Sequence, residues 1–390
     1  MNATNNPTQD IETDRRVRTY GQLKLELIQR GLFVPGEILA APDVASGVCP
    51  GAPGEEVALT LAENFIVKAV LKADGEGRMR LKLQNGALLL DSGDGEDEEV
   101  GIIPLPQFLK NLMRERTPLS ENICLDGYCL NIFLRAIDKG KKLSLSLDGI
   151  LSIVQSAFEE GAADLVQLNM DYCGDKDRGF QLLSPVVEAI KKKFKTFVAL
   201  KGFPPQEKRT IDLMYAAGFD LLDFPLAGFA GADPAGDIVS SAQVSESLEY
   251  AVGIFPQGTV WTELVLGPEP LDLIKKKIDD LTRRGVIPLL KLMPTSMHTA
   301  KDYWRVKEVA RHLGEAAQRD KLPLKWLYPN CRSVSPLDTK YFTEDPKSAQ
   351  LAAKPVYRSR LGKKASEGFA ALRRKLRIKD VSDSYESAGL

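Results

Sequence analysis

The chain has 390 residues, and 44% of them are hydrophobic, enough for a large domain with a substantial core and a smaller domain beside it. Its 52 lysine and arginine residues nearly balance 53 aspartate and glutamate residues, for a formal net charge of -1. A chain this close to neutral has no overall field that would draw it to nucleic acid or to an anionic membrane. We therefore expect neither as a partner.

The N-terminal residues and the thiols favour a cytoplasmic protein. Residues 1–16 are polar and lack the apolar core of a secretion signal, and no uninterrupted apolar run is long enough to span a bilayer. The cysteines are too few and too scattered for a disulfide scaffold in a chain of this length. We expect each to be either buried or available as a ligand: Cys49, Cys124, Cys129, Cys173 and Cys331.

Changes in composition divide the chain into four regions. The first region is polar, the second contains short apolar runs broken by glycine and acidic turns, the third alternates strand and helix patterns, and the last is strongly basic. We predict a disordered N-terminus at 1–18, a small α+β module at 19–117, a barrel at 118–335 and a basic helical C-terminal tail at 336–390.

Within the module, the pattern predicts a helix over 19–32, a β-rich segment over 55–104 and a linker helix over 104–118. The acidic run at 91–99 lacks the ordered ligand spacing of a calcium-binding loop, so we interpret it as a solvated hairpin turn.

The third region alternates amphipathic helices with short apolar strands, as βα units around a parallel sheet do. Strands buried on both faces favour closure into a full or partial TIM-like (β/α) barrel, so the predicted fold class is α/β. An open doubly wound sheet is the competing fold, although no Gly-x-Gly-x-x-Gly follows any strand. Expected strands lie near Cys124 and at 164–170, 196–200, 219–224, 258–266, 286–292 and 325–328; expected helices lie at 147–158, 186–194, 209–217, 245–252, 271–281 and 303–313.

Active sites of parallel barrels gather where the strands end, so polar residues at those positions are the candidates. Glu263 lies within an apolar strand, where an unpaired carboxylate would cost several kcal/mol to bury, so it needs a cation or a ligand. Lys201 and Lys291 are the cations at neighbouring strand ends, and we weigh a structural ion pair equally against a role in ligand binding. The set is Cys124, Cys129, Asn169, Asp171, Cys173, Lys201, Glu263, Lys291, Asn330 and Cys331.

Three of these residues are thiols that suggest a metal or a cluster. Cys124 and Cys129 are expected where the first barrel strand ends, and Cys173 follows the next strand, so the three could meet as soft ligands for iron–sulfur or zinc. Isolated cysteines in apolar surroundings are more often buried and inert. Other catalytic templates are missing: His298 and His312 accompany no recognisable nucleophile, and there is no Walker loop or zinc-binding His-Glu-x-x-His helix.

Five stretches of the predicted barrel, at 143–161, 186–199, 216–224, 261–270 and 285–288, follow one another in a familiar order. Through them, about half of the chain resembles the radical S-adenosylmethionine (radical SAM) superfamily. Residues 143–161 are similar to the first helix after that family's cluster loop, and 186–199 to its next helix and strand. Residues 216–224 resemble its fourth strand, and 261–270 with 285–288 resemble the fifth and sixth units. The family's Cys-x3-Cys-x2-Cys motif is degenerate here, since only Cys129 matches and Cys124 is the other thiol nearby.

The resemblance implies a [4Fe-4S] cluster and S-adenosyl-L-methionine as cofactors, with Cys124, Cys129 and Cys173 as an atypical set of metal ligands. It also implies that Asn169 and Asp171 lie where the family binds the SAM amine, that Glu263 lies near the adenosyl group, and that Lys291 belongs to the same cofactor site.

Three functions remain open. In the first, the protein is a radical SAM-type enzyme that generates a 5′-deoxyadenosyl radical and acts on a small-molecule substrate. In the second, it is a cluster-free barrel that serves as a binding or scaffold subunit for a catalytic partner protein. The third is a cluster-free aldolase-like or lyase barrel that uses Lys201 or Lys291.

Overall fold

The computed structural model describes the module and most of the barrel region. The residues described are 19–49, 55–63, 65–73, 79–93, 97–115, 118–226, 239–266, 269–292, 300–344 and 351. The predicted disordered N-terminus, His298 and most of the predicted basic tail lie outside these residues. Among the helices described, none has both the length and the apolar character needed to cross a bilayer.

The larger sheet of the described chain has eight strands in the order β18-β17-β16-β15-β14-β13-β10-β9. The six neighbouring strands from β10 to β17 are parallel. At the two edges of this parallel group, β9 pairs antiparallel with β10 and β18 pairs antiparallel with β17. The strands are β9 (Ile123–Asp126), β10 (Cys129–Leu134), β13 (Leu165–Met170), β14 (Phe197–Lys201), β15 (Leu221–Asp223), β16 (Val260–Val265), β17 (Ile287–Lys291) and β18 (Ser333–Val334).

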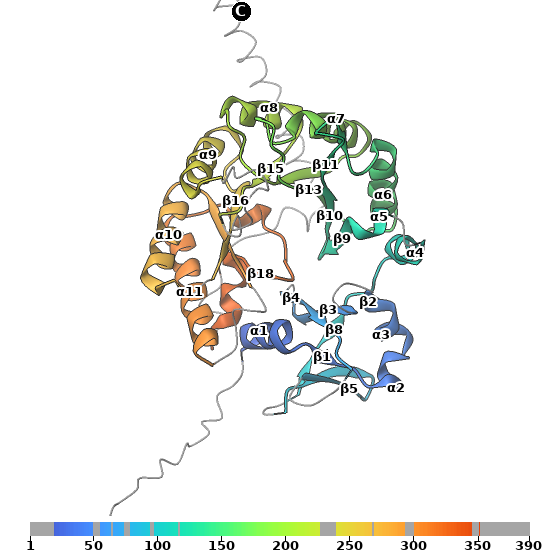
Figure 1. The fold of residues 1–390 in the computed structure, drawn as a ribbon. Coiled ribbons are helices and arrows are strands. Elements are labelled where there is room, and N and C mark those ends of the chain that lie inside the picture. Colours follow the sequence, from blue (N-terminus) through green and yellow to red (C-terminus); the bar gives the residue numbers. More distant parts are fainter. Residues whose placement is uncertain are drawn as a thin grey trace, which may run out of the picture.

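The sheet curls into an arc, and helices cover its outer face (Figure 1). The protein is therefore an α/β partial barrel, as the sequence predicts. The outer helices are α6 (Leu147–Glu159), α7 (Phe180–Lys193), α8 (Arg209–Ala217), α9 (Ser241–Ile254), α10 (Leu271–Arg283) and α11 (Ala300–Arg319). On the side of the sheet facing these helices, residues such as Val166, Val198 and Leu222 are fully buried.

Two predictions about the barrel elements are wrong. The segment 325–328 is not a strand: the short 3-10 helix η2 (Leu324–Trp326) occupies this part of the chain, and the last strand is β18. Helix α7 begins at Phe180, before the predicted start, because the Asp177 carboxylate accepts hydrogen bonds from the backbone N–H groups of Gly179 and Gln181.

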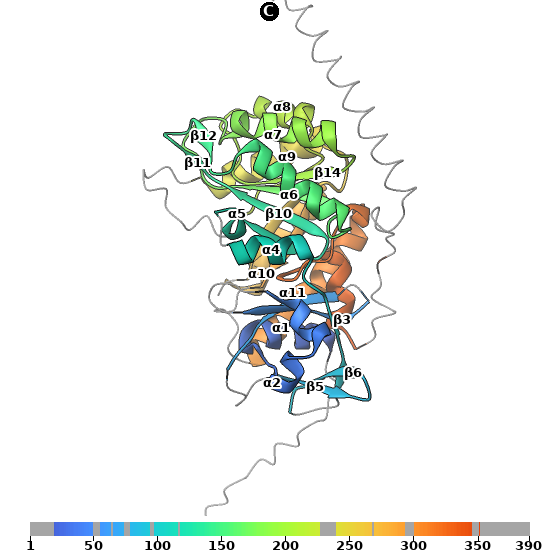
Figure 2. The same cartoon turned by 90° about the vertical axis from the view of Figure 1, so that its right-hand side faces the viewer.

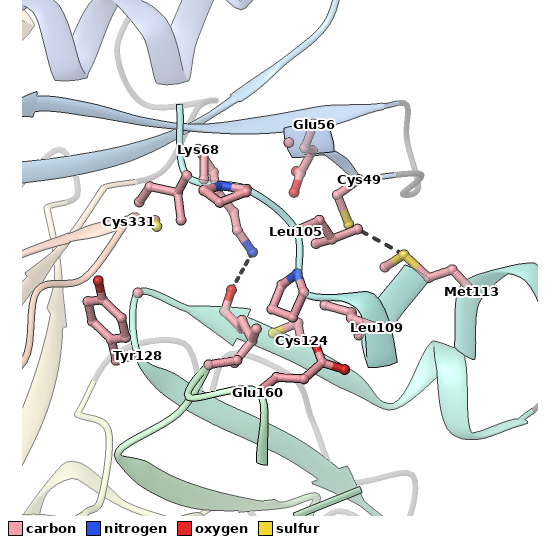
Figure 3. A pocket seen from close by; sticks show the side chains of 18 of the residues that line it. Cys49, Glu56, Lys68, Leu105, Leu109, Met113, Cys124, Tyr128, Glu160 and Cys331 are labelled. Carbon is pink, nitrogen blue, oxygen red and sulfur yellow. Dashed lines mark hydrogen bonds between the residues drawn. The ribbon is translucent and has the colours of Figure 1, made fainter. Parts of the chain in front are cut away.

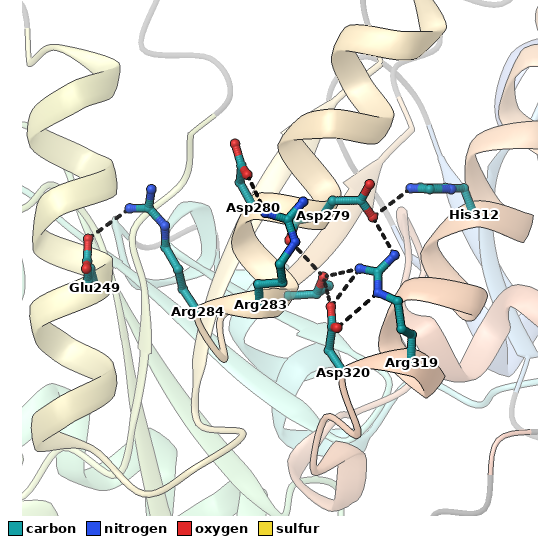
Figure 4. Close-up of polar contacts among 9 residues, drawn as sticks. Glu249, Asp279, Asp280, Arg283, Arg284, His312, Arg319 and Asp320 are labelled. Atoms are coloured by element: carbon teal, nitrogen blue, oxygen red, sulfur yellow. Dashed lines mark hydrogen bonds and ion pairs between the residues drawn. The ribbon is translucent and has the colours of Figure 1, made fainter.

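The outer helices α10 and α11 are joined by a group of polar contacts (Figure 4). Asp279 Oδ1 lies 3.0 Å from His312 Nε2 and 2.9 Å from Arg319 Nη1. Thr282 is buried and donates its hydroxyl to Asp320 at 2.6 Å. These contacts explain His312 as part of an interhelical polar network.

The N-terminal module lies at the open side of the arc (Figures 1 and 2). Its elements form two small sheets with a helix beside them, and the predicted hairpin at the acidic run is present as the antiparallel pair β6–β7. The elements are α1 (Tyr20–Arg30), β1 (Leu32–Phe33), α2 (Gly36–Leu39), α3 (Pro42–Gly47), β2 (Val48–Cys49), β3 (Glu56–Ala62), β4 (Phe65–Val70), β5 (Met79–Gln84), β6 (Ala87–Asp91), β7 (Glu98–Glu99) and β8 (Gly101–Ile102).

Two helices link the module to the barrel, and two small elements complete the described chain. Helix α4 (Gln107–Glu115) confirms the predicted linker helix, and α5 (Pro118–Glu121) follows it. The strands β11 (Ala136–Ile137) and β12 (Lys142–Leu143) form a hairpin before α6. The 3-10 helix η3 (Pro336–Phe342) is the part of the predicted basic tail that the structure describes as regular structure.

The module and the barrel share one hydrophobic core. Phe65 of β4 stacks on Tyr341 of η3 with ring centroids 4.4 Å apart, and it meets Phe342 edge to face at 6.2 Å. Gly21 of α1 lies against the Phe342 ring so closely that a Cβ atom would be 2.5 Å from it. The module is therefore packed onto the barrel through aromatic contacts.

Candidate functional site

The inner face of the arc changes from apolar to polar along each strand. Because alternate residues of a strand point to the same face, Leu165, Gln167 and Asn169 of β13 face inward in that order. The apolar residues at the strand starts join Trp326 and Leu327 in a second hydrophobic cluster that closes this end of the barrel. The inward residues towards the strand ends are Phe133, Asn169, Lys201, Asp223, Glu263 and Lys291.

These residues line a cavity of about 460 Å³. This volume is in the range of sites for small organic molecules. Glu56 and Lys68 of the module also line the cavity, as does the connection between η2 and β18, including Asn330 and Cys331. The cavity therefore has three walls of different origin: the arc, the module and that connection.

Glu263 is the centre of an ion cluster at the strand ends. Its Oε1 accepts from Lys201 Nζ at 2.5 Å and its Oε2 from Lys291 Nζ at 3.1 Å. Burial acts to raise the pKa of Glu263, but the two lysines outweigh it and hold the pKa below its usual value. The predicted pairing of Glu263 with these lysines is thus present, and both of its oxygens are used.

Asp223, at the end of β15, is the carboxylate that the cluster leaves unsatisfied. Its side chain is only 5% exposed, and its Oδ2 lies 3.6 Å from Lys201 Nζ, an ion-pair distance longer than a hydrogen bond. Its Oδ1 is buried and has no hydrogen-bond partner among the described residues. Burial raises the pKa of Asp223 to about 6, and the charge of Glu263 adds to this effect while Lys201 opposes it.

Three amide side chains continue the polar surface across β10 and β13. Gln167 Nε2 donates to Asn131 Oδ1 at 2.9 Å and to Asn169 Oδ1 at 2.8 Å. Asn169 Nδ2 donates to Asn131 Oδ1 at 3.2 Å. These mutual contacts fix the orientation of the amides and give the cavity a wall of dipoles that can both donate and accept.

The structure brings together part of the predicted cofactor set. Asn169, Glu263 and Lys291 all line the cavity, but Asp171 is exposed beyond the end of β13 and is not among the lining residues. Sequence reasoning missed Asp223, although its signal was the same as that of Glu263: a carboxylate within an apolar run, Phe219 to Phe224.

The three predicted metal ligands are not brought together. Cys129 begins β10 and pairs in register with Leu165, whereas Cys173 follows the far end of β13. The length of β13 alone separates these ends by about 17 Å, at roughly 3.3 Å per residue. Cys173 donates its S–H to Asp175 Oδ2 at 3.4 Å, and burial raises its pKa.

The expected position of Cys124 and Cys129 at a strand end is also wrong. They lie on the antiparallel hairpin β9–β10, whose two turn residues are Gly127, with φ +59°, and Tyr128. Glycine with positive φ at the first central position favours a two-residue hairpin turn of type II′, and a Cβ atom on Gly127 would be 3.0 Å from the Pro329 carbonyl oxygen. Burial raises the pKa of Cys129 well above its usual value, which keeps the thiol protonated.

The donor set therefore does not fit a [4Fe-4S] cluster, which needs thiolates around a common centre. In the part of the chain that the structure describes, no three His, Cys, Asp or Glu side chains are arranged to hold a metal ion. The side chains that face the cavity are instead those of acid–base chemistry and of hydrogen bonding to an organic ligand.

A second cavity, of about 290 Å³, lies between the module and the barrel (Figure 3). Apolar side chains such as Leu105 and Leu109 form much of its wall, and Cys49 Sγ contacts Met113 Sδ at 3.8 Å. Lys68 and Cys124 line both cavities, and Lys68 Nζ donates to the Leu125 carbonyl oxygen at 2.7 Å.

Comparisons with known proteins add a distant likeness of fold. No family model matches the chain, and no curated protein does. The solved structures similar to it include the DHPS of Yersinia pestis with a pterine–sulfa conjugate, at 12% identity and a TM-score of 0.30, covering 65% of this chain and 99% of that one. Another is 7,8-dihydropteroate synthase from Vibrio fischeri, at 12% identity and a TM-score of 0.24, covering 45% and 85%. Likenesses this distant carry no argument about activity.

Proposed function

We propose that this protein is a cluster-free barrel enzyme that moves a proton on a small polar molecule bound in the larger cavity. The observation that carries the proposal is Asp223: a buried carboxylate in the cavity wall with an oxygen that has no partner among the described residues. Leaving a buried oxygen unpaired costs about 1–3 kcal/mol, so a ligand group that donates to it would recover that energy.

Asp223 suits the role of general base. Its pKa of about 6 leaves it mostly ionised at neutral pH and makes it a stronger base than an ordinary carboxylate. The neighbouring Glu263 is held ionised by its two lysines and keeps both oxygens occupied. When the pKa values of two nearby carboxylates are shifted in opposite directions, the two groups are suited to different roles in acid–base chemistry.

Lys291 is the group that would stabilise negative charge on the substrate. Its side chain is 38% exposed, whereas Lys201 is 23% exposed and lies between Glu263 and Asp223. Asp223 would remove a proton from a carbon next to a carbonyl, the C–H electron pair would form the enolate, and the enolate oxygen would face the Lys291 ammonium. Return of the proton from Asp223 completes the cycle without another reactant.

The remaining interpretations have less support. Burial would lower the pKa of Lys201, but Asp223 and Glu263 outweigh it and raise the pKa, which favours the ammonium over the free amine that a Schiff base needs. A radical SAM activity would need the three thiols that the structure places apart. A protein that served only as a scaffold would not need a buried carboxylate in the wall of a cavity.

The test measures the exchange of hydrogen for deuterium in small 2-keto acids dissolved in deuterium oxide. Proton NMR monitors the loss of the signal from the hydrogens next to the carbonyl. We expect the protein to exchange the hydrogens next to the carbonyl, with a rate that rises through about pH 6 as Asp223 ionises. Asp223→Asn should reduce the rate at least about 100-fold, because it removes the base and keeps the shape.

Glu246→Gln is the matched control, because Glu246 is 64% exposed in its pair with Lys208 on the outer helices. It should leave the rate unchanged. Wild-type protein that exchanges none of the keto acids, or Asp223→Asn protein that exchanges them at the wild-type rate, would contradict the proposal. A borohydride-stable adduct on Lys291 would replace it with Schiff-base chemistry.

A further inference from the structure

One wall of the larger cavity is a short piece of chain rather than part of the arc. Pro329–Ser335, here called the wall segment, lies between η2 and η3 and includes β18. Asn330, Cys331 and Ser333 of this segment line the cavity, and Ser333 pairs in register with Lys291 of β17. Its position therefore sets the width of the cavity beside Lys291.

A lysine of the module holds the wall segment from outside the barrel. Lys24 of α1 is completely buried, and its Nζ donates to the carbonyl oxygens of Asn330 at 2.7 Å and Ser333 at 3.0 Å. The ammonium also lies 4.7 Å from the centre of the Phe65 ring. Lys24 thus connects the module to two carbonyl groups in the cavity wall.

A completely buried lysine needs a reason, because desolvation of an ammonium is costly. Burial lowers the pKa of Lys24, and the charge of Asp338 in η3 opposes this effect. An apolar side chain in place of Lys24 would avoid the cost of desolvating an ammonium. What it would not do is satisfy two carbonyl groups that both belong to the wall segment.

The barrel and the module hold the wall segment at two further points. The Cys331 backbone N–H donates to Asp126 Oδ1 of β9 at 2.7 Å, and Arg332 Nη2 pairs with Glu56 Oε1 of β3 at 2.6 Å. Within the segment, Asn330 Oδ1 accepts from the backbone N–H groups of Arg332 and Ser333. The segment therefore has hydrogen bonds of its own and is held by contacts from both the barrel and the module.

We propose that Lys24 is a positioning residue for the cavity: it fixes the wall segment, so that docking of the module limits how far water enters the cavity past this wall. This role goes beyond the proton-transfer chemistry and does not depend on it. It also gives the module a function in the site, although its helix α1 supplies no side chain to the cavity lining.

The test uses Cys331 as a reporter, in full-length protein carrying Lys24→Met. Cys331 is 1% exposed in the wall segment, whereas Cys173 is 6% exposed after the end of β13 and lines neither cavity. Under native conditions we expect iodoacetamide to alkylate Cys331 at least about tenfold faster in the variant, with Cys173 unchanged, as followed by peptide mass spectrometry. Lys82→Met, which removes an exposed lysine of β5, is the matched control and should label as wild type does.

A second readout separates positioning from mere packing. Carbon-13 NMR of the Asp223 carboxyl should show its titration midpoint move from about 6 down toward the usual range in Lys24→Met, because an opened wall lets water reach the carboxylate. Unchanged Cys331 labelling, or faster labelling with an unchanged Asp223 midpoint, overturns the proposal.

Global unfolding would instead raise Cys173 and Cys331 labelling equally. In that case Lys24→Gln decides, because the shorter neutral amide cannot reach both carbonyl groups but keeps a donor, so it is a milder change than Lys24→Met. Selective labelling of Cys331 in this variant supports the proposal, and wild-type labelling overturns it.

Discussion

At the scale of single residues, the chemistry of the cavity depends on how desolvation and the neighbouring lysines shift the pKa values of Asp223 and Glu263. Both carboxylates are almost entirely removed from water, yet their pKa values move in opposite directions. The difference is geometric: Glu263 receives one lysine on each oxygen, and Asp223 is left with a 3.6 Å contact to Lys201. A buried carboxylate without a good partner favours its protonated form.

The raised pKa of Asp223 predicts a pH dependence of stability. The folded protein binds the Asp223 proton up to about pH 6, whereas the unfolded chain releases it near 3.8, so stability falls as pH rises through this window. Asp223→Asn has no charge to bury. The free energy of unfolding of the variant, relative to wild type, should therefore increase by about 3 kcal/mol between pH 3.5 and pH 7.

Urea unfolding of both proteins at several pH values measures this difference, in which groups common to both cancel. A difference that stays constant across the window would mean that Asp223 ionises like an exposed aspartate. Glu246→Gln, the exposed carboxylate on α9, should show no such change.

The sequence predicted the cavity residues unevenly, for a physical reason. Glu263, Lys201 and Lys291 were predictable because a charge inside an apolar run requires a partner. That requirement does not say which oxygen remains unpaired, because the answer depends on distances between β14, β15 and β16. The sequence did not mark Asn131 and Gln167 as site residues, because an uncharged amide on a strand does not require a charged partner. The two amides meet only through the pairing of β10 with β13.

At the scale of elements, the outer helices are held by polar contacts that differ in burial. Asp279 on α10 is 23% exposed and contacts both His312 and Arg319 on α11, whereas its neighbour Asp280 is 45% exposed and contacts Arg283 within its own helix. Exposed pairs within a helix contribute a few tenths of a kcal/mol, and partly buried pairs between elements contribute more.

We therefore predict different costs for two adjacent substitutions. Asp279→Asn should lower the free energy of unfolding by about 1 kcal/mol, and Asp280→Asn by less than about 0.5 kcal/mol. Urea unfolding at low ionic strength measures both, and added salt should reduce the loss caused by Asp279→Asn. Equal losses for the two variants would show that the contacts to α11 add nothing.

Element boundaries were predicted best where one residue decides them. The end of α8 before Gly218, whose φ is +130°, follows from the conformational freedom of glycine. The hairpin turn at Gly127 and Tyr128 was missed because Cys124 and Cys129 were interpreted as ligands rather than as neighbours of a turn. The segment near Trp326 is apolar because it fills the barrel end. From the sequence alone, a short apolar run of this kind cannot be distinguished from a buried strand.

At the scale of the whole molecule, the placement of the module could not have been predicted from local patterns. Lys24 meets its acceptors 306 and 309 residues further along the chain, and Thr19 shares a hydrogen bond with Tyr303. Such pairings leave no periodic signal. They make the module part of the barrel, since the shared core includes Leu23 and Phe65 of the module together with Phe342.

This shared core predicts that the module and the barrel unfold together. Separating them would expose the aromatic contacts around Phe65 and would strip the buried Lys24 of both its acceptors, so a state with only the module unfolded should be poorly populated. All three tryptophans, Trp261, Trp304 and Trp326, belong to the barrel, so their fluorescence reports barrel unfolding alone. Pulsed hydrogen exchange of the β3 and β4 amides reports the module, and the two urea midpoints should coincide. A module midpoint at clearly lower urea would mean that the wall segment loses its Lys24 contacts while the barrel is still folded, and the module would then be a separate cooperative unit.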